Sequence, residues 1–327
     1  MYSVEIKNKA VFDTFLAAVD TDWVDVVLTP KAAMFTQNVS ETFAAYQMPA
    51  ECSAGEPSYG FRVQKSLLKL LTVEGRINMT VSSDTVEYEF VNDVVRRTVT
   101  APRHQSFTFQ FKEKLEVLQR GKASEFNAAE LKPMFNIASK LYSFVEVVNG
   151  VAGIMTRGGL RIYRKVNAPS FCLSAKAAHS LYSCNNLWYS SQNYIYAVNG
   201  SFGIVVSQCR GSGQEDFSFL EEDDAKAAAV AIIDFTDVTV VASKLPKATI
   251  SLDLRAGCCR LANGDVQYAI QTPLEDVRMN DRFNKEVPLL TKLFTDILPK
   301  MPSRKVLFRV KPYYCLAEVD GYTIVCK

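Results

Sequence analysis

The sequence has few residues of the kinds that bind metals or carry protons in catalysis. Only two histidines, His104 and His179, occur among its 327 residues, and they lie far apart. None of the eight cysteines forms a C-x-x-C pair, whereas structural zinc sites normally show paired ligands at short spacing. We therefore expect no metal site and no cofactor. We expect the cysteines to be free thiols that pack as small apolar groups, as is typical of reducing cytoplasm.

The sequence also lacks a long apolar run. No stretch approaches the ~20 residues that a membrane-spanning helix needs. The N-terminus, with Glu5 beside Lys7 and Lys9, lacks the cationic start and apolar segment of a secretory signal. We therefore expect no membrane association. The net charge of only +2 indicates no strong overall attraction to nucleic acid. Whether part of the surface could bind nucleic acid therefore depends on where the charged residues lie.

Catalytic motifs are missing as well. G-x-S-x-G, H-E-x-x-H and G-x-G-x-x-G do not occur. Gly121 and Lys122 resemble the end of a phosphate-binding loop, but Glu116 stands at the position of its first glycine and Ala123 at that of its Ser or Thr. The acidic run 221–224 is more typical of a helix N-terminus than of a cation site. These patterns predict a protein that is not an enzyme.

What the sequence does contain is a unit that occurs six times: a short apolar strand, an amphipathic helix and then alternating strands. Such a unit cannot bury its apolar faces alone, so six units predict three pairs. The expected opening strands are 4–6, 61–63, 171–173 and 217–219, with Phe126 and Phe283 opening the other two units. The expected helices are 11–19, 64–73, 128–141, 175–183, 223–235 and 287–298.

Tight-turn dipeptides separate the strands and indicate how they pair. Asn-Gly or Asp-Gly stands between apolar runs at residues 149–150, 199–200, 263–264 and 320–321, and Gly158-Gly159 is a further candidate. These dipeptides tolerate the positive φ of two-residue hairpins. Strictly alternating strands such as 85–90 favour antiparallel sheets with one buried face, and therefore an α+β fold.

Polar stretches at 113–124 and 210–215 mark candidate domain boundaries. With a length that suits two to three domains, they predict three domains: residues 1–122, 123–213 and 214–327.

Basic side chains recur on the polar faces of four of the six expected helices. Lysines on one such helix are ordinarily solvated surface, but their repetition favours contact with phosphates without reading bases. The first and fifth expected helices carry aspartates on their polar faces and do not show this basic pattern. His179 could contact DNA or could cap the packed face of its helix. The candidate DNA-binding residues are Lys65, Lys69, Arg76, Lys132, Lys140, Lys176, Lys285 and Lys292.

Three pairs of such units with basic helix faces resemble the processivity clamps of DNA replication, and above all the bacterial-type sliding clamp. Residues 144–150 resemble the strand and Asn-Gly hairpin of that family's middle domain. Residues 156–162 resemble its T-D-G-H-R-L stretch without the Asp and His, and residues 321–327 its final strand without the Met-Pro-Met ending. The repeat covers essentially the whole chain. The departures indicate a divergent member, for which a phage origin and a host cytoplasm are one explanation.

The resemblance implies a DNA clamp fold of three domains, with helices lining a ring and sheets outside. Two chains would close head to tail around duplex DNA as a homodimer and tether the replicative polymerase. Closure would pair an edge strand of the first domain with one of the third, here residues 94–101 and 266–272.

The resemblance also implies a pocket between the second and third domains for short hydrophobic peptides of DNA polymerase and of clamp-loader proteins. Ile162, Phe219 and Ile324 could equally be ordinary strand core. Two other functions stay open: a DNA-binding replication accessory factor that does not encircle DNA, and a viral interaction protein that uses the repeats as a scaffold. The candidate pocket residues are Leu160, Arg161, Ile162, Phe217, Phe219, Ile324 and Val325.

Overall fold

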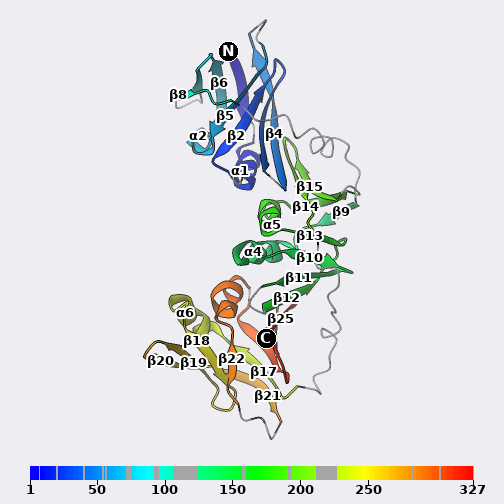
Figure 1. Cartoon of the computed structure of the whole chain (residues 1–327), viewed down its shortest axis with the longest axis vertical. Helices are drawn as coiled ribbons and strands as arrows, with labels where there is room; N and C mark the ends of the chain where they lie inside the picture. Colours follow the sequence, from blue (N-terminus) through cyan, green and yellow to red (C-terminus); the bar gives the residue numbers. More distant parts are fainter. Residues whose placement is uncertain are drawn as a thin grey trace. The chain divides into compact units, whose positions relative to one another are not determined.

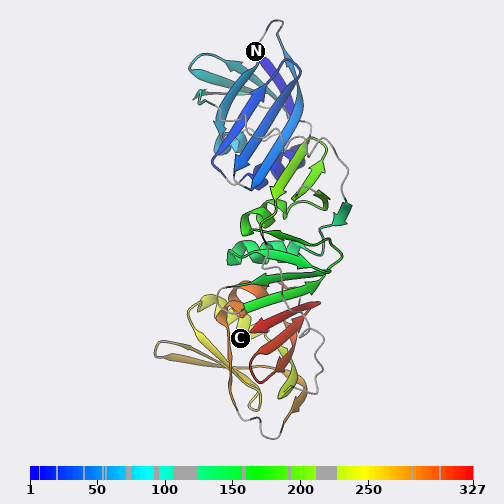
Figure 2. The same ribbon diagram turned by 45° about the vertical axis from the view of Figure 1, so that its right-hand side comes forward.

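The structure is a computed structural model of the chain (Figures 1 and 2). It describes residues 1–6, 8–19, 21–39, 41–53, 55, 57–70, 75–91, 96–105, 124–156, 160–190, 193–210, 227–280, 283, 285–301 and 303–326. 

These residues form two compact units: an N-terminal unit of Met1–Lys132 and Lys176–Cys209, and a C-terminal unit of Pro133–Ala175 and Arg210–Lys327. The finer division into three domains stays a prediction.

The N-terminal unit is built on one antiparallel sheet of 12 strands in the order β8-β7-β6-β1-β4-β16-β15-β14-β9, with β2, β3 and β5 branching from β4. Strand β4 is the longest, and it pairs with β1, β3 and β16 along different parts of its length. The strands are β1 Tyr2–Ile6, β2 Trp23–Leu28, β3 Ala32–Val39, β4 Thr42–Cys52, β5 Tyr59–Gln64, β6 Gly75–Val81, β7 Thr85–Val91, β8 Arg96–Pro102, β9 Ser124–Asn127, β14 Asn186–Ser190, β15 Tyr194–Asn199 and β16 Phe202–Ser207.

The core of this unit lies between the sheet and helix α1 (Lys9–Ala18). Asn8 is the N-cap of the helix, and its side-chain oxygen accepts the N–H of Val11. Phe12 and Phe15 are 0% exposed. The ring of Phe12 packs edge-on against that of Tyr46, with centroids 4.9 Å apart. The helical spacing of these apolar side chains therefore fixes which face of α1 covers the sheet.

The C-terminal unit holds two antiparallel sheets, of nine strands in the order β13-β10-β11-β12-β25-β24-β23-β17-β21 and of four in the order β20-β19-β18-β22. The nine-stranded sheet is formed by β10 Val145–Val148, β11 Val151–Met155, β12 Leu160–Lys165, β13 Phe171–Leu173, β17 Ala229–Asp234, β21 Leu274–Met279, β23 Lys305–Val310, β24 Cys315–Val319 and β25 Tyr322–Cys326. The four-stranded sheet is formed by β18 Thr249–Asp253, β19 Cys258–Asn263, β20 Val266–Gln271 and β22 Val287–Leu289.

The helices of the C-terminal unit cover one face of its sheets. Helix α6 (Thr236–Lys244) lies beside the helical segment η4 (Leu293–Ile297) and η5 (Leu298–Lys300) (Figure 1). Phe235, just before α6, contacts Phe294 of η4 and Phe308 of β23, with ring centroids 5.1 and 6.4 Å apart. The face of the sheet that carries Phe308 is therefore the one that faces the helices.

The turn dipeptides lie where the sequence predicts hairpins. Each of the four Asn-Gly or Asp-Gly pairs joins two consecutive antiparallel strands: β10–β11, β15–β16, β19–β20 and β24–β25. Asn149, Gly150, Asp320 and Gly321 all have positive φ, between 50° and 78°. The predicted α+β fold with antiparallel sheets is confirmed. Gly158 and Gly159 lie outside the described residues, between the paired strands β11 and β12.

Four of the six expected helices are found close to their predicted positions: α1, α2 (Lys65–Leu70), α4 (Lys132–Leu141) and α5 (Ala175–Leu181).

The fifth expected helix, residues 223–235, is wrong for the part that the structure describes. Residues Ala229–Asp234 form strand β17, which pairs with β21 and β23, and the helix follows as α6. The alanine-rich start of this stretch favours a helix, but Val230, Ile232 and Ile233 are β-branched and lie in a strand with neighbours on both sides. A continuous apolar run does not distinguish a buried helix from a buried central strand.

The sixth expected helix, residues 287–298, begins too early. Val287–Leu289 is strand β22, which pairs with β18, and the helical turns follow it. Pro288 lies in this strand at the edge of the four-stranded sheet, the position where a strand tolerates a residue without an N–H.

The state of the cysteines agrees with the sequence analysis. All eight cysteines are free, and six of them are buried. Burial raises the pKa of Cys184 and of Cys259 to about 11, so these thiols stay neutral near pH 7. Within the described ranges, no helix is both long and apolar enough to cross a membrane.

A core substitution tests the packing of α1. Replacing Phe15 with Ala leaves a cavity beside Phe202 and should destabilise the N-terminal unit by about 3–5 kcal/mol. Leu70→Ala, at a side chain that is 67% exposed, is the control and should cost under about 0.5 kcal/mol. Urea unfolding followed by tryptophan fluorescence is selective, because the only two tryptophans of the sequence, Trp23 and Trp188, lie in this unit. Equal midpoints for the two variants would contradict the packing described.

Candidate DNA-facing helices, sheet edges and partner face

Helix α2 carries the first two candidate DNA-binding residues. Lys69 is exposed in its last turn, opposite the buried Leu68. Lys65 is half-buried, and its ammonium group donates to the carbonyl of Val19, 2.5 Å away, at the C-terminal cap of α1. A cation at a helix C-terminus is stabilising, so Lys65 has a structural role of its own. Arg76 does not lie on a helix as the periodicity predicts: it lies in β6, opposite Glu5 of β1, because the chain turns into a strand at Gly75.

Helix α4 shows the expected division into an apolar and a polar face. Met134, Phe135, Ile137 and Ala138 are buried, while Lys140 is exposed. Lys132 is half-exposed and donates to the side-chain oxygen of Asn185 at 2.6 Å. 

Helix α5 has the same pattern. Ala177, Ala178 and Leu181 are buried, and Lys176 and His179 are exposed three residues apart. The spacing of i and i+3 puts His179 on the same face as Lys176, away from the packed side.

The C-terminal unit brings two lysines close to one another. Lys300 of η5 donates to the carbonyl of Asp296, and its pKa is lowered first by burial and then by the positive charge of Lys140. Two cations that repel each other at a helix surface favour an anion beside them.

The remaining two candidates of this unit differ from each other. Lys292 is exposed in the helical turn before η4. Lys285 lies in the connection before β22, not on a helix, because the sixth helix starts later than predicted.

The two helices that lack a basic stripe in the sequence look different in the structure. In α1, Lys9 forms an ion pair with Asp13, one turn on, at 2.5 Å, so this polar face offers little net charge. In α6, Lys244 lies exposed in the last turn. Sequence analysis missed Lys244, because the fifth helix was placed too early. The β-branched residues Val230, Ile232 and Ile233 followed by the acidic first-turn residue Asp237 are the signal that could have located it.

Strand β8 is a regular, exposed edge of the 12-stranded sheet. The N–H of Arg103 bonds to the carbonyl of Asp84, and the register to β7 runs without a shift. In an antiparallel pair, residues that bond to the neighbour alternate with residues whose N–H and C=O point away. The outward-pointing backbone groups of β8 are therefore those of Arg96, Thr98, Thr100 and Pro102.

Strand β20 is the corresponding edge of the four-stranded sheet. Val266 and Tyr268 are 51% and 43% exposed. The N–H of Thr272 bonds to the carbonyl of Gly257, so alternation directs the N–H of Tyr268 toward β19 and that of Ala269 outward. 

Strand β21, at the end of the nine-stranded sheet, is less suited to pairing. Its register to β17 shifts, and Asp276 in the shifted stretch has a φ of 51°. Such bulges are one way in which proteins keep edges from pairing.

Five of the seven candidate pocket residues meet on two neighbouring strands of the C-terminal unit. In the register of β12 and β25, Leu160 lies opposite Cys326, Arg161 opposite Val325 and Ile162 opposite Ile324. Leu160, Ile162 and Ile324 are at most 1% exposed. Ile324 is also paired with Ala317, next to Phe308, so this set points toward the helices and belongs to the core. Phe217 and Phe219 lie outside the described residues.

The opposite face of the same strands carries a cluster of which sequence analysis had named only Val325. Tyr163, Leu316 and Val325 pack together, with the partly buried Val151 and Tyr314 against them; we call these five residues the Tyr163 cluster. Its three central side chains are at most 4% exposed, so Val151 and Tyr314 form its accessible border. Alternation of residues places Arg161 on this face as well. 

Beside the Tyr163 cluster, on the same face, lies an ion pair of Arg309 and Glu318 at 2.6 Å. An apolar centre with a polar border is the usual composition of a peptide-binding surface. In sequence, Tyr163 and Tyr314 look like ordinary strand residues, and only the pairing of β12 with β25 brings them together.

Among the residues that the structure describes, no three His, Cys, Asp or Glu side chains gather closely enough to hold a metal ion. No known family model matches the chain, and neither does any curated protein sequence.

Comparison with solved structures identifies the fold. The chain is similar to a DNA polymerase III β subunit of Eubacterium rectale, with a TM-score of 0.70 and 9% identity over 100% of this chain and 98% of the other. It is similar to the DNA polymerase III β subunit of Pseudomonas aeruginosa, with a TM-score of 0.67 and 15% identity over 100% of this chain and 99% of the other. It is also similar to a Helicobacter pylori β clamp bound to a DNA ligase peptide. The TM-score is 0.67 and the identity 10%, over 100% of this chain and 99% of the other. The chain therefore has the fold of bacterial β sliding clamps over its whole length.

Proposed function

We propose that this protein is a DNA sliding clamp: a ring of two chains that encircles duplex DNA and tethers a polymerase without catalysing a reaction. The observation that carries the proposal is the full-length match to β clamps together with exposed cations on four helices, α2, α4, α5 and α6, whose other faces are buried. The solved structures that it resembles include a β clamp bound to a DNA ligase peptide. Its free thiols favour the cytoplasm, or a host cytoplasm if the source is a phage.

The helix lysines are suited to loose phosphate contact. Lysine offers a flexible point charge without the planar fork with which arginine fixes a carboxylate or phosphate. Lys140 and Lys300, which repel each other in the free protein, would each gain from a phosphate nearby. Contacts of this kind hold DNA regardless of sequence and permit sliding.

Charge reversal at two helices tests the DNA face. Lys69→Glu together with Lys140→Glu should weaken duplex binding at low salt and flatten the plot of log affinity against log salt concentration, because fewer counterions are released. Lys31→Glu with Lys165→Glu changes the net charge equally at exposed lysines outside the helices and is the matched control. Fluorescence anisotropy of a labelled duplex gives both values. A slope that is the same in the two double variants would remove these helices from the DNA interface.

We further propose that β8 of one chain pairs with β20 of the other to close the ring. Both edges are regular, both lie near the predicted ranges 94–101 and 266–272, and both direct a row of N–H and C=O groups outward. Two such edges can form hydrogen bonds with each other, because an exposed regular edge presents unpaired N–H and C=O groups to another strand. A proline at Tyr268 would disturb the sheet itself, since alternation directs that N–H toward β19.

A proline at Ala269 tests ring closure instead. It removes an outward N–H while leaving the ladder to β19 in place, so Ala269→Pro should give folded monomers where the wild type is a dimer. Ala269→Val keeps the N–H and should remain a dimer. Sedimentation velocity at micromolar concentration distinguishes them. A wild type that sediments as a monomer, or a proline variant that dimerises as tightly as the valine variant, would rule out this closure.

For partner peptides, we propose the Tyr163 cluster as the docking face, reached at its border. This refines the sequence prediction: Arg161 and Val325 lie on that face, whereas Leu160, Ile162 and Ile324 support it from the core. Deleting the last residues would remove β25 from between β12 and β24 and would test folding rather than binding.

A point substitution tests this face without touching the strand order. Val151→Glu puts a charge at the border of the Tyr163 cluster and should weaken binding of a peptide from the cognate polymerase by about tenfold or more. Val198→Glu, at a side chain 41% exposed in the N-terminal unit, is the matched control. Titration by anisotropy gives the affinities. Unchanged binding by the Val151 variant would mean that polymerase peptides bind elsewhere.

A further inference from the structure

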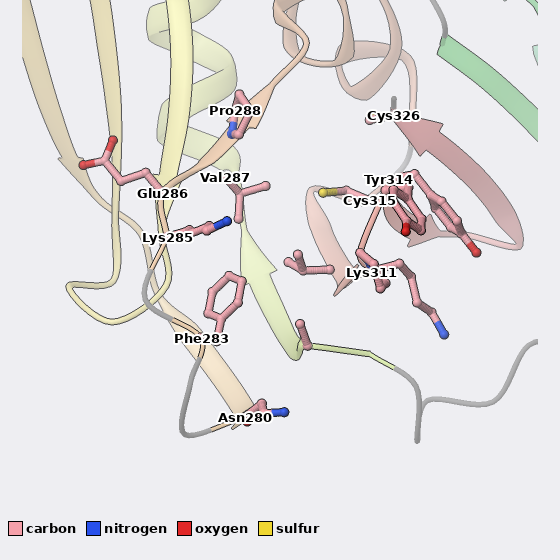
Figure 3. A pocket seen from close by; sticks show the side chains of 14 residues that line it. Asn280, Phe283, Lys285, Glu286, Val287, Pro288, Lys311, Tyr314, Cys315 and Cys326 are labelled. Atoms are coloured by element: carbon pink, nitrogen blue, oxygen red, sulfur yellow. The ribbon is translucent and has the colours of Figure 1, made fainter.

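A hollow of about 420 Å³ lies on the 12-stranded sheet of the N-terminal unit; we call it the Gly203 hollow. The adjacent strands β3, β4, β16 and β15 line it, together with the turn between β15 and β16. Among the described residues, it has none in common with the Tyr163 cluster or with the pocket of the C-terminal unit shown in Figure 3. Its volume falls in the range of sites that hold a ligand.

The Gly203 hollow lies on the face of the sheet that points away from α1. Phe35, Tyr46 and Phe202 are in register across β3, β4 and β16. Each of the three rings contacts Phe12 or Phe15 of α1. Because side chains alternate along a strand, the residues on either side of these three point to the opposite face.

Small side chains create the hollow. Gly203 lies opposite Ala45 of β4 on one side and opposite Val198 of β15 on the other. On the same face, Ala32 of β3 lies opposite Pro49. No side chain fills the middle of this face, so Val198 and Pro49 stand at its border. Glycine inside a strand often marks a place where a ligand or another chain approaches closely.

An apolar cluster continues the same face beyond the hollow. Ala45 and Met34 belong both to the hollow and to this cluster, in which Phe43, Tyr196 and Val205 are further members. Trp188 borders the cluster and stacks on Tyr196, with ring centroids 5.9 Å apart. A ligand that lies in the hollow can therefore extend along apolar ground on one side.

The other side of the hollow carries an uncompensated positive charge. Lys31 lines it, is exposed, and forms no ion pair with any residue in the described part of the chain. No Asp or Glu is among the described residues that line the hollow. An occupant therefore gains from an anionic group next to its apolar part.

Two polar side chains favour a peptide over a lipid-like molecule. Gln47 and Ser201 are exposed and lie side by side, since the backbone N–H of Gln47 bonds to the carbonyl of Ser201 at 2.8 Å. An amide and a hydroxyl both donate and accept hydrogen bonds, so they match the N–H and C=O groups of a peptide backbone. A hydrocarbon chain laid over them would displace water without replacing its hydrogen bonds, which is unfavourable.

We propose that the Gly203 hollow binds an extended segment of a partner protein. The segment places one apolar side chain over Gly203 and Ala45, pairs an Asp or Glu with Lys31, and bonds through its backbone to Gln47 and Ser201. The N-terminal unit thus has a docking surface of its own, and the inference does not depend on the clamp function.

Differential selection of peptides on the intact protein tests the proposal. Gly203→Val fills the hollow, and valine suits a strand, so the variant should fold with the urea midpoint of the wild type or a higher one. A phage-displayed library of random dodecapeptides is depleted on Gly203→Val and then selected on the wild type. Enriched peptides should combine an aliphatic or aromatic residue with an Asp or Glu. If Gly203→Val does not fold, Lys31→Glu, at an exposed side chain, serves for the depletion.

A fluorescein-labelled synthetic copy of the best peptide then locates the site. Lys31→Glu and Val198→Glu should each weaken its binding at least about tenfold, through the lost ion pair and through a charge at the border of the hollow. Lys165→Glu, an equal charge change at an exposed lysine of the C-terminal unit, and Val151→Glu, at the Tyr163 cluster, should leave its affinity unchanged.

Three results would overturn the proposal. The first is that no peptide is enriched on the wild type after depletion. The second is that enriched peptides bind the wild type, Lys31→Glu and Val198→Glu equally. The third is that the two substitutions weaken the binding of dodecanoate but of no peptide, which would assign the hollow to free amphipathic anions.

Discussion

Two main-chain ladders hold this structure together: β4 with β16 in the N-terminal unit, and β12 with β25 in the C-terminal unit. Each joins strands that are far apart in the sequence, and each satisfies backbone groups that would otherwise form an exposed edge. The sheets therefore continue across both of the domain boundaries that the sequence predicts. The strands that remain at the sheet edges also carry backbone groups that need hydrogen-bond partners. Strand β21 is interrupted by a bulge, whereas β8 and β20 are regular and exposed, which is why we assign ring closure to them.

The continuous sheets also determine where charge can act. Because the buried face of each helix packs on a sheet, its opposite face is the one left for lysines such as Lys69, Lys140 and Lys176. A net charge of +2 means that the protein as a whole attracts DNA weakly. Weak and local attraction suits a ring, in which retention comes from topology and the contacts only need to permit movement along the duplex.

Much of the fold was predictable because its signals are local. Asn149-Gly150 and Asp320-Gly321 require the positive φ that they show, and the alternation of β7 specifies a one-sided sheet. The errors occur where local signals conflict with tertiary context. Residues 229–233 are apolar throughout, which does not distinguish a helix from a strand, and they belong to the central strand β17, paired on both sides. Arg76 continues the helical spacing of α2 in sequence, yet the chain has already entered β6.

The candidate sites were predictable only in part, for the same reason. Exposed lysines follow from helix periodicity, so Lys69 and Lys140 could be named in advance. Lys244 could not, because its helix was misplaced. The Tyr163 cluster and the Gly203 hollow each depend on strands brought together from distant segments, and no spacing within one segment encodes that.

Encirclement is the central claim, and retention on circular DNA tests it most directly. Chains reassembled from dilute monomers in the presence of a nicked plasmid should stay with the plasmid through gel filtration at high salt. They should leave it when a restriction enzyme linearises the DNA, because a ring can then slide off the ends. Equal retention on circular and linear plasmid, falling with salt in the same way on both, would show surface adhesion instead and contradict the account.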